Sequence, residues 1–323
     1  PNAGRYDGPL GVLTALAVVE MLHSEGMRLS FHVDVVAFGD EEGVRFGTTL
    51  LGSHPVAGHW NFEWWNLKDD DDVTMREAFT QFALDPDRIT ECTRDTAELM
   101  GFLELHIEQG PVLEEGGDPL GVVTGIAGAR RFQVTLRGRA GHAGTVPMSM
   151  RRDALLGAGA VALIVERVAL EEGIVATVGQ FECRPGAVNV ISEEVVWSLD
   201  IRAPDDLARD IALKRIRDEC DRVCGERGLI SHWQETHRAS AVDCAQQLQS
   251  AQTEALKKLG LNPVKLMSGA GHDAMAMAHV TDVGMFFIRC ADGISHHPDE
   301  SVIQDDVAWG IAGMTQTLIN LDE

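Results

Sequence analysis

The sequence predicts an α/β protein whose chain is interrupted by a smaller α+β domain. Stretches with helical and strand periodicity alternate over residues 1–127 and again over residues 237–323. Between them, residues 128–236 show the order strand, helix, strand, strand, helix, which is typical of one sheet with helices on one face. A length of 323 residues also corresponds to about two domains. We therefore expect residues 1–127 and 237–323 to form one domain, and residues 128–236 to form a second domain inserted into it.

Apolar periodicity and turn residues define the elements expected in the first segment. Leu10 to Glu25 is a predicted helix ended by Gly26, because glycine readily adopts the left-handed conformation at helix ends. Phe31 to Phe38 is rich in valine and alternates in character, which predicts a strand. The later elements expected here are helices over Val73–Leu84 and Thr93–Met100, and strands over Phe102–Ile107 and Leu120–Ile126.

The inserted segment begins with a predicted strand over Arg131–Arg137, followed by a Gly/Ala/His loop over Gly138–Gly144. Further elements expected there are a helix over Arg152–Leu170, strands over Ile174–Phe181 and Val195–Arg202, and a helix from Pro204 to about Gly225. In the last segment we expect helices over Gln246–Leu259 and Asp305–Leu321 and a strand over Gly284–Ile288.

Composition argues against several classes of partner. Lys and Arg number 27 and Asp and Glu number 50, so the net charge is 27 − 50 = −23, which disfavours binding to nucleic acid or to an anionic membrane. No apolar run is long enough to span a bilayer. The six cysteines are scattered along a large chain, which suits a reducing cytoplasm better than a disulfide framework. Cys220 and Cys224 are more typical of a helix core than of a metal pair.

Acidic and histidine side chains gather at predicted strand ends and glycine-rich turns, where α/β proteins concentrate functional groups. They are Asp7, Glu41, Glu42, His106, His142, His272, Asp273, His296 and His297. Each is a weak signal alone. Together, dispersed histidines and carboxylates are what a two-metal hydrolase needs, since a carboxylate bridges two cations and a second carboxylate accepts the proton of water. Adjacent Glu41 and Glu42 face one site only if the chain turns there, and Gly43 permits that turn.

Several short segments carry these residues in a recognisable order. They are Gly4-Arg5-Tyr6-Asp7-Gly8, Glu41-Glu42-Gly43-Val44-Arg45-Phe46, His106-Ile107-Glu108-Gln109-Gly110-Pro111, Gly141-His142-Ala143-Gly144-Thr145-Val146-Pro147-Met148, Asn189-Val190-Ile191, Asp200-Ile201-Arg202, Ser268-Gly269-Ala270-Gly271-His272-Asp273-Ala274 and Gly293-Ile294-Ser295-His296. Over nearly the whole chain they resemble the M20-type metallo-amidohydrolases, in particular allantoate amidohydrolases and N-carbamoyl-L-amino-acid hydrolases.

The resemblance implies a metallopeptidase-like catalytic domain with an inserted ferredoxin-like lid and dimerisation domain. It implies that Asp7 bridges two divalent cations and that Glu42 and His296 are ligands of one cation. It further implies that His106 is a ligand of the other cation and that Glu41 is the general base. The implied substrate contacts are Gln109, His142, Asn189, Arg202 and Gly271, of which His142 is also catalytic. His272 and Asp273 are expected to shape the pocket rather than to bind metal.

The resemblance also implies the reaction and the partners. Gly144–Arg151 and Phe287–Cys290 resemble allantoate enzymes more than carbamoylases, so the expected reaction is cleavage of the ureido group of allantoate, a small ureido carboxylate, with release of ammonia and CO₂. The expected cations are Mn²⁺, with Zn²⁺ permitted, because carboxylates suit Mn²⁺ and imidazoles suit Zn²⁺. The expected assembly is a homodimer, in which His142 and Asn189 reach the site on domain closure, one of them from the partner subunit. An N-carbamoyl-L-amino-acid hydrolase is the alternative reaction.

The sequence departs from the family pattern in one respect. The family carries a His-x-Asp motif upstream of the bridging aspartate, and Asp7 lies too close to the first residue for that motif to be present. None of His23, His32, His54 or His59 occupies a matching position. A non-catalytic dimeric fragment is therefore a hypothesis from a different functional class.

Overall fold

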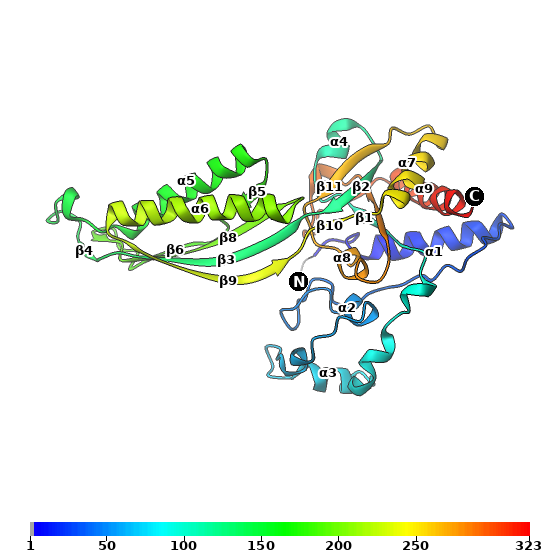
Figure 1. The fold of residues 1–323 in the computed structure, drawn as a ribbon, viewed down its shortest axis with the longest axis horizontal. Helices are drawn as coiled ribbons and strands as arrows, with labels where there is room; N and C mark the ends of the chain where they lie inside the picture. The colour runs from blue at the N-terminus through cyan, green and yellow to red at the C-terminus, as the bar shows by residue number, and fades with distance from the viewer. Residues whose placement is uncertain (1–2) are drawn as a thin grey trace. The chain divides into compact units, whose positions relative to one another are not determined.

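The computed structural model describes residues 3–323, and the chain divides into two compact units. Unit 1 contains the residues up to Ile126 together with Asp243–Glu323, and unit 2 is Ala127–Val242. Both units combine helices and strands (Figure 1). The predicted mixed α/β class, with an α+β segment inserted into the chain, is therefore confirmed.

A mixed sheet forms the centre of unit 1. Its strands are β1 (Phe102–Ile107), β2 (Leu120–Ile126), β10 (Val242–Asp243), β11 (Val264–Ser268) and β12 (Val283–Ile288). β12 lies between β1, to which it is parallel, and β2, to which it is antiparallel, and β11 pairs in parallel with β2. Every residue of β12 is buried, as expected for a strand covered on both faces of its sheet.

Helices pack on this sheet through apolar side chains. The helices of unit 1 are α1 (Pro9–Ser24), α2 (Ser53–Val56), α3 (Met75–Gln81), α4 (Val112–Gly116), α7 (Gln246–Lys258), α8 (Ala274–Met277) and α9 (Gln304–Asp322). Short 3-10 turns cover Phe62–Asn66, Pro86–Cys92, Thr96–Glu98 and Ala291–Gly293. Leu10 and Val18 of α1, Phe286 of β12 and Met314 of α9 belong to one buried cluster. This packing supports β1, the strand on which Glu104 and His106 lie.

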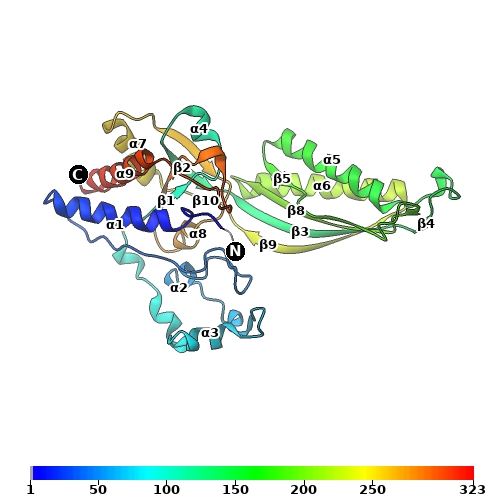
Figure 2. The same cartoon turned by 180° about the vertical axis from the view of Figure 1, so that it is seen from behind.

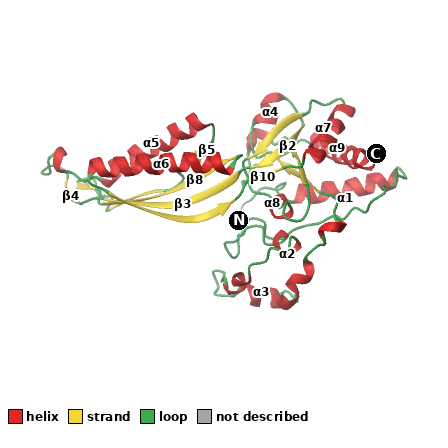
Figure 3. Cartoon of the chain, viewed as in Figure 1, coloured by secondary structure: helices red, strands yellow, loops and turns green. Residues whose placement is uncertain are grey.

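Two expected elements of unit 1 are absent. Phe31–Phe38, predicted as a strand, is drawn as a loop in Figure 3 and has no strand partner among the described residues. Its alternation fits a half-buried surface, but a strand forms only where a neighbouring backbone completes the hydrogen-bond ladder. Thr93–Met100, predicted as a helix, contains only the 3-10 turn Thr96–Glu98, because Asp95 accepts the N–H of Ala97 and favours a local turn.

Unit 2 is an antiparallel sheet covered by two helices. Its main strands are β3 (Gly128–Arg137), β5 (Val175–Thr177), β6 (Phe181–Arg184), β8 (Glu194–Ala203) and β9 (Ile230–Ala239), and its helices are α5 (Ala154–Glu172) and α6 (Asp206–Arg227). The sheet order is β5-β8-β3-β9, with β6 also on β8, and both helices lie on the same face in Figures 1 and 2. This chain order and sheet order describe a ferredoxin-like fold.

Three details of unit 2 differ from expectation. The predicted strand over Ile174–Phe181 is two strands, β5 and β6, because residues 178–180 leave the ladder. The predicted loop over Gly138–Gly144 contains β4 (Gly141–His142), which pairs with β7 (Val190–Ile191), and a 3-10 turn follows at Met148–Met150. β9 was not expected from the sequence, since its polar composition hides its alternation.

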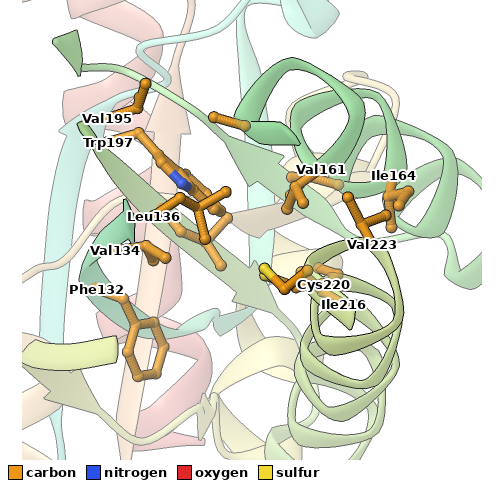
Figure 4. Close-up of a cluster of buried hydrophobic side chains, with 14 of the residues drawn as sticks. Phe132, Val134, Leu136, Val161, Ile164, Val195, Trp197, Ile216, Cys220 and Val223 are labelled. Atoms are coloured by element: carbon orange, nitrogen blue, oxygen red, sulfur yellow. The ribbon is translucent and has the colours of Figure 1, made fainter. Parts of the chain in front are cut away.

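The core of unit 2 lies between the sheet and the helices (Figure 4). β8 alternates buried and half-buried residues, and Trp197 and Leu199 are on its buried face. Ile216 and Cys220 of α6 belong to the same cluster. Cys220 and Cys224 are free, buried thiols, which agrees with the expected helix-core role. Among the described residues, no helix is both long and apolar enough to cross a membrane.

Candidate metal centre

A tight turn presents Glu41 and Glu42. Gly43 adopts a φ of +67°, and a Cβ atom added there would lie 2.4 Å from the carbonyl oxygen of Thr48. The N–H of Leu50 donates to the carbonyl of Glu41 over 2.7 Å and closes the loop. Because the chain turns here, both carboxylates line the same cavity of unit 1, as the sequence required for a shared site. Glu41 is half-buried and Glu42 is exposed.

Buried Glu300 holds the backbone of Asp7. The N–H groups of Tyr6 and Asp7 donate to Glu300 Oε1 over 2.7 and 3.0 Å. The two carboxylate oxygens of Asp7 then face different histidines, with Oδ1 3.0 Å from His106 Nε2 and Oδ2 3.3 Å from His296 Nε2. Burial raises the pKa of Asp7, but His106 and Ser295 outweigh it and lower this pKa to about 2. An ionised carboxylate that faces two imidazoles has the arrangement of a bridging ligand.

Asp7, Glu42 and His296 form a first group of ligand atoms, all within 4.8 Å of one another. Glu42 Oε1 lies 2.9 Å from His296 Nε2. His296 and Gln109 both have a φ in the left-handed region, at +55° and +57°, which is uncommon for residues other than glycine and clusters at functional sites. Gln109 Nε2 donates to Asp7 Oδ2 over 2.8 Å, so this predicted substrate contact binds the carboxylate of Asp7 in the structure.

Glu104, His106 and His272 form a second group of ligand atoms, also within 4.8 Å of one another. Glu104 and His106 are two residues apart on β1 and therefore lie on one face of the sheet. Burial raises the pKa of Glu104 to about 7 and lowers that of His272 well below its ordinary value. Burial also lowers the pKa of His106, but the nearby Asp7 and Glu104 carboxylates raise it to about 9.

Sequence reasoning did not single out Glu104 and assigned His272 to pocket shape. The only sequence signal for Glu104 is its spacing of two residues from His106 on a predicted strand. For His272 the signal is its place in a glycine-rich loop after β11. The structure brings both side chains to His106, whose ring centroid lies 4.5 Å from that of His272.

Glu41 lies beside these groups without belonging to either set of ligands. Burial, followed by the charges of Glu42, Asp273 and Glu104, raises the pKa of Glu41 to about 8. Gly271 is a neighbour of Glu41, since a Cβ atom added there would lie at an ordinary contact distance of 4.0 Å from Glu41 Oε1. A half-buried carboxylate with a raised pKa suits general base chemistry near neutral pH, and nearby cations would lower that pKa.

The side chains present fit divalent cations. Both groups mix carboxylate oxygens with imidazole nitrogens, which are ligands of Mn²⁺ and Zn²⁺. In addition, the buried Nδ1 atom of His272 has no hydrogen-bond partner among the described residues. Residues of both groups line a cavity of about 1590 Å³ within unit 1, which is large enough for a small substrate.

The remaining predicted site residues lie on unit 2, at two ends of its sheet. His142 is on the short β4–β7 ladder, and the N–H of Ala143 donates to the carbonyl of Asn189, so these two positions are neighbours. Arg202 lies on β8 opposite Ala129, at the start of β3. His142 follows the end of β3, a strand of ten residues that is roughly 30 Å long at about 3.3 Å per residue.

The predicted substrate contacts in unit 2 therefore lie at two separate places. A single copy of this unit does not bring His142 and Asn189 close to Arg202, because the whole length of β3 separates them. Arg202 binds both oxygens of Asp200 over 2.8 Å, and Arg131 binds the same carboxylate. Two guanidinium groups therefore share one carboxylate at this end of the sheet.

The known proteins that are similar to this chain agree with one another in family. The pattern of peptidase family M20/M25/M40 matches residues 2–320. An allantoate deiminase of Arabidopsis thaliana is 41% identical over 97% of this chain and 65% of its own length. An N-carbamoyl-L-amino acid amidohydrolase of Geobacillus stearothermophilus is 39% identical over 99% of this chain and 78% of its own length. The present chain thus spans somewhat less than two thirds of the Arabidopsis protein.

A solved structure agrees with these relatives. An amidase of the hydantoinase/carbamoylase family from Burkholderia multivorans superposes with a TM-score of 0.92 and 33% identity, covering 100% of this chain and 79% of that chain. The family pattern extends over nearly every described residue, and both units of the fold are included in the superposition. The chain therefore belongs to peptidase family M20/M25/M40.

Proposed function

We propose that this protein hydrolyses the ureido group of allantoate with the help of two divalent cations, giving a ureido product, ammonia and CO₂. The observation that carries the proposal is the convergence of Asp7, Glu42, His106 and His296 around a half-buried Glu41. The 41% identity to an allantoate deiminase supports the choice of substrate. Asp7, Glu42 and His296 would hold one cation, and Asp7 and His106 would contribute to the other. Mn²⁺ is the preferred ion and Zn²⁺ is the second choice.

Residues of the chain itself would carry out the proton transfers of the reaction. The cations, when bound, supply Lewis acidity for the water and the ureido carbonyl. Glu41 accepts the proton of the attacking water and delivers it to the leaving nitrogen, so that the C–N bond breaks as the new C–O bond forms. Its place beside Glu42, outside the two ligand groups, leaves its oxygens available for this transfer. Gly271 places backbone without a side chain next to Glu41.

We propose that residues of unit 2 bind the substrate. Arg202 would hold the substrate carboxylate, because guanidinium binds carboxylate through two parallel hydrogen bonds and Arg131 shares the charge of Asp200. His142 and Asn189 would donate hydrogen bonds to the developing oxyanion. Since these groups lie at opposite ends of the unit 2 sheet, we assign them to two copies of the chain in a homodimer.

A second candidate function uses the same residues. The 39% identity to an N-carbamoyl-L-amino acid amidohydrolase favours a carbamoyl amino acid as an alternative substrate. Both reactions cleave a ureido C–N bond in a molecule that carries a carboxylate, so the metal groups and Glu41 do not separate them. The ratio of kcat/KM for allantoate to kcat/KM for N-carbamoyl-methionine separates the two candidates, with a ratio above one expected.

The decisive experiment measures ammonia release from allantoate by the protein with added Mn²⁺. We expect release that stops when a chelator is added. The Glu41→Gln variant should lose turnover by at least about 100-fold while keeping its bound metal, because a general base contributes about 10²–10⁴-fold. Glu20→Gln, at an exposed position of α1, is the matched control and should remain active. Loss of metal in Glu41→Gln would contradict the base assignment, and a metal-loaded protein that releases no ammonia would contradict the proposed reaction.

A further inference from the structure

The starting observation is an arginine that binds two backbone carbonyls of the loop that carries His142. Arg151 Nε donates to the carbonyl of Val146 over 3.1 Å, and Arg151 Nη2 donates to the carbonyl of Ala143 over 2.5 Å. A guanidinium group presents its donors in a rigid fork, so these two bonds fix the two carbonyls relative to each other. Arg151 is half-buried and ends the segment Gly144–Arg151, which resembles allantoate enzymes.

Regular secondary structure contributes little to holding this loop. The loop connects β3 to α5, and within it Gly141–His142 pairs with β7 in a ladder of only two residues. The loop is closed at its base, where the N–H of Arg139 donates to the carbonyl of Arg152 over 2.8 Å. A Cβ atom added at Gly138 would lie 2.0 Å from the same carbonyl oxygen, so only glycine fits at this close approach. Beyond the base, Arg151 joins the two halves of the loop.

The same loop orients the ring of His142. The N–H of Gly144 donates to His142 Nδ1 over 3.1 Å. Nδ1 therefore carries a lone pair, the ring is neutral, and its proton is on Nε2. Nε2–H is the group that the proposed function requires as a donor to the oxyanion. The N–H of Val146 also donates to the carbonyl of His142 over 3.3 Å, so the backbone of the histidine belongs to the same turn.

Ala143 connects the arginine to the histidine ring. It lies between His142 and Gly144, the two residues that form the ring contact. Its carbonyl accepts Arg151 Nη2, and its N–H donates to the carbonyl of Asn189 over 2.9 Å, so this residue is held on both sides. Without the guanidinium, one of these two restraints is lost, and the N–H of Gly144 is no longer fixed against His142 Nδ1.

We propose that Arg151 is a positioning residue for His142, because it holds the loop in the conformation in which Gly144 fixes the ring with Nε2–H as its donor. Groups that stabilise a transition state must be held within about 0.5 Å of their productive position. His142 is exposed, so packing contributes little to that restraint. Arg151 supplies it through the backbone and touches neither substrate nor cation. This inference rests on the proposed function and deepens it.

The first measurement is hydrogen–deuterium exchange of the Gly144 amide in the whole protein without metal or substrate. The bond to His142 Nδ1 protects this amide, so its exchange rate reports whether the ring contact is formed. Arg151→Met keeps an apolar stem but removes both donors, and we expect the amide to exchange about tenfold faster. Arg151→Lys should give an intermediate rate, because a single ammonium group does not reproduce the fork of the guanidinium.

Arg137→Met is the matched control. Arg137 lies at the end of β3, just before the loop, and its Nε donates to a carboxylate oxygen of Glu194 over 2.9 Å. The control therefore removes a guanidinium group from the same end of unit 2 and leaves the carbonyls of the loop bound. Exchange of the Gly144 amide should not change in this variant. Circular dichroism of each variant should match the unchanged protein.

The second measurement separates kcat from KM for allantoate with added Mn²⁺. A donor to the oxyanion acts mainly in the transition state, so Arg151→Met should lower kcat by up to about 100-fold with little change in KM. His142→Ala, which removes the donor itself, should lose about 10²–10³-fold. In the His142→Ala background, Arg151→Met should have little further effect, because the ring that it positions is no longer present.

Two results would overturn the proposal. One is an unchanged exchange rate of the Gly144 amide in a folded Arg151→Met variant. The other is a loss of kcat from Arg151→Met that is equally large with and without the ring of His142. Failure of the proposed function has a different signature, namely a metal-loaded unchanged protein that releases no ammonia. The exchange measurement needs neither metal nor turnover, so it decides the role of Arg151 in either case.

Discussion

At the scale of single residues, the conformation of the backbone at a few positions determines how the side chains of the candidate metal centre are oriented. Asp7 is oriented by a buried carboxylate 293 positions away, and Gly43 makes the turn that directs Glu41 and Glu42 into one cavity. His296 and Gln109 adopt the left-handed conformation despite their side chains. Such conformations persist only where the surrounding structure enforces them, and in proteins they cluster at active sites and ligand-binding sites.

Gly43→Ala is expected to destabilise unit 1 by more than Gly26→Ala. Both glycines have a φ near +66°, so both substitutions carry the cost of about 1–2 kcal/mol for a left-handed residue. Only at Gly43 does the new Cβ meet backbone, 2.4 Å from Thr48, whereas at Gly26 nothing lies within 4 Å. Urea unfolding of both variants measures the difference. Equal loss of stability in the two variants would show that the Thr48 contact relaxes freely.

At the scale of elements, strand and helix patterns explain the packing of each unit. β8 buries alternate residues against α5 and α6, and Asp205 caps the N-terminus of α6, where its carboxylate accepts the N–H of Ala208. The neighbouring strands β3 and β9 are joined by Arg130 and Glu235 as well as by their backbone ladder. These elements are stabilised inside unit 2 without any contribution from the metal ligands.

Ile216→Ala should cost about 2–5 kcal/mol of unfolding free energy, because it removes buried methyl groups and leaves a cavity in the core of unit 2. Ile211→Ala is the matched control on the same helix. Ile216 is fully buried and Ile211 is 47% exposed, so the control should cost much less. Chemical denaturation of both variants measures this. A similar cost for both would mean that helix propensity, rather than packing, determines the effect.

The contribution of Glu235 should depend on pH. Hydrogen bonds from Arg238 and Arg130 lower its pKa from 4.5 to about 2. Because the folded pKa is the lower one, the stabilisation is present above about pH 4.5 and is lost as the pH falls toward 2. Glu235→Gln should therefore flatten the acid limb of the stability curve, measured by urea unfolding between those values. Glu182→Gln, exposed on β6, is the control, and an unchanged slope in Glu235→Gln would contradict the assignment.

At the scale of the whole molecule, the two units carry different parts of the proposed chemistry. All candidate metal ligands and Glu41 belong to unit 1, and the proposed donors and carboxylate-binding arginine belong to unit 2. Within unit 2, the length of β3 separates His142 from Arg202. A small substrate that needs both groups therefore requires them from two copies of the chain, which is the physical reason for the proposed homodimer.

Mixing two inactive variants tests that assembly. Glu41→Gln removes the proposed base and His142→Ala removes the proposed oxyanion donor, so each variant alone should be inactive. After subunit exchange at equal amounts, half of the dimers are mixed, and each mixed dimer has one complete site if His142 acts on its partner. We therefore expect about a quarter of the unchanged activity for a two-fold symmetric dimer. Activity that stays at zero, with exchange verified by native mass spectrometry, would place His142 on its own chain.

The local pattern of apolar residues in the sequence was sufficient to predict many of the helices and strands. The predicted helices at α1, α5, α7 and α9 and the strands at β1, β2 and β12 are confirmed within a few residues, because their periodicity depends on near neighbours in the chain. Phe31–Phe38 has the same kind of pattern and forms no strand. A ladder partner is a property of another segment, so alternation alone could not decide that prediction.

The sequence by itself determined the family, the alternation of elements and a list of acids and histidines suited to metal. Tertiary structure alone decided which of these meet. Asp7 faces His296 from the other end of the chain, and Glu104 reaches His272 across separate elements. It also decided that Ser268 contacts the ring of His272 and that the carbonyl of Ile107 contacts the ring of His106. Coordination and hydrogen bonding depend on distances of a few ångströms between residues far apart in sequence, and folding alone sets those distances.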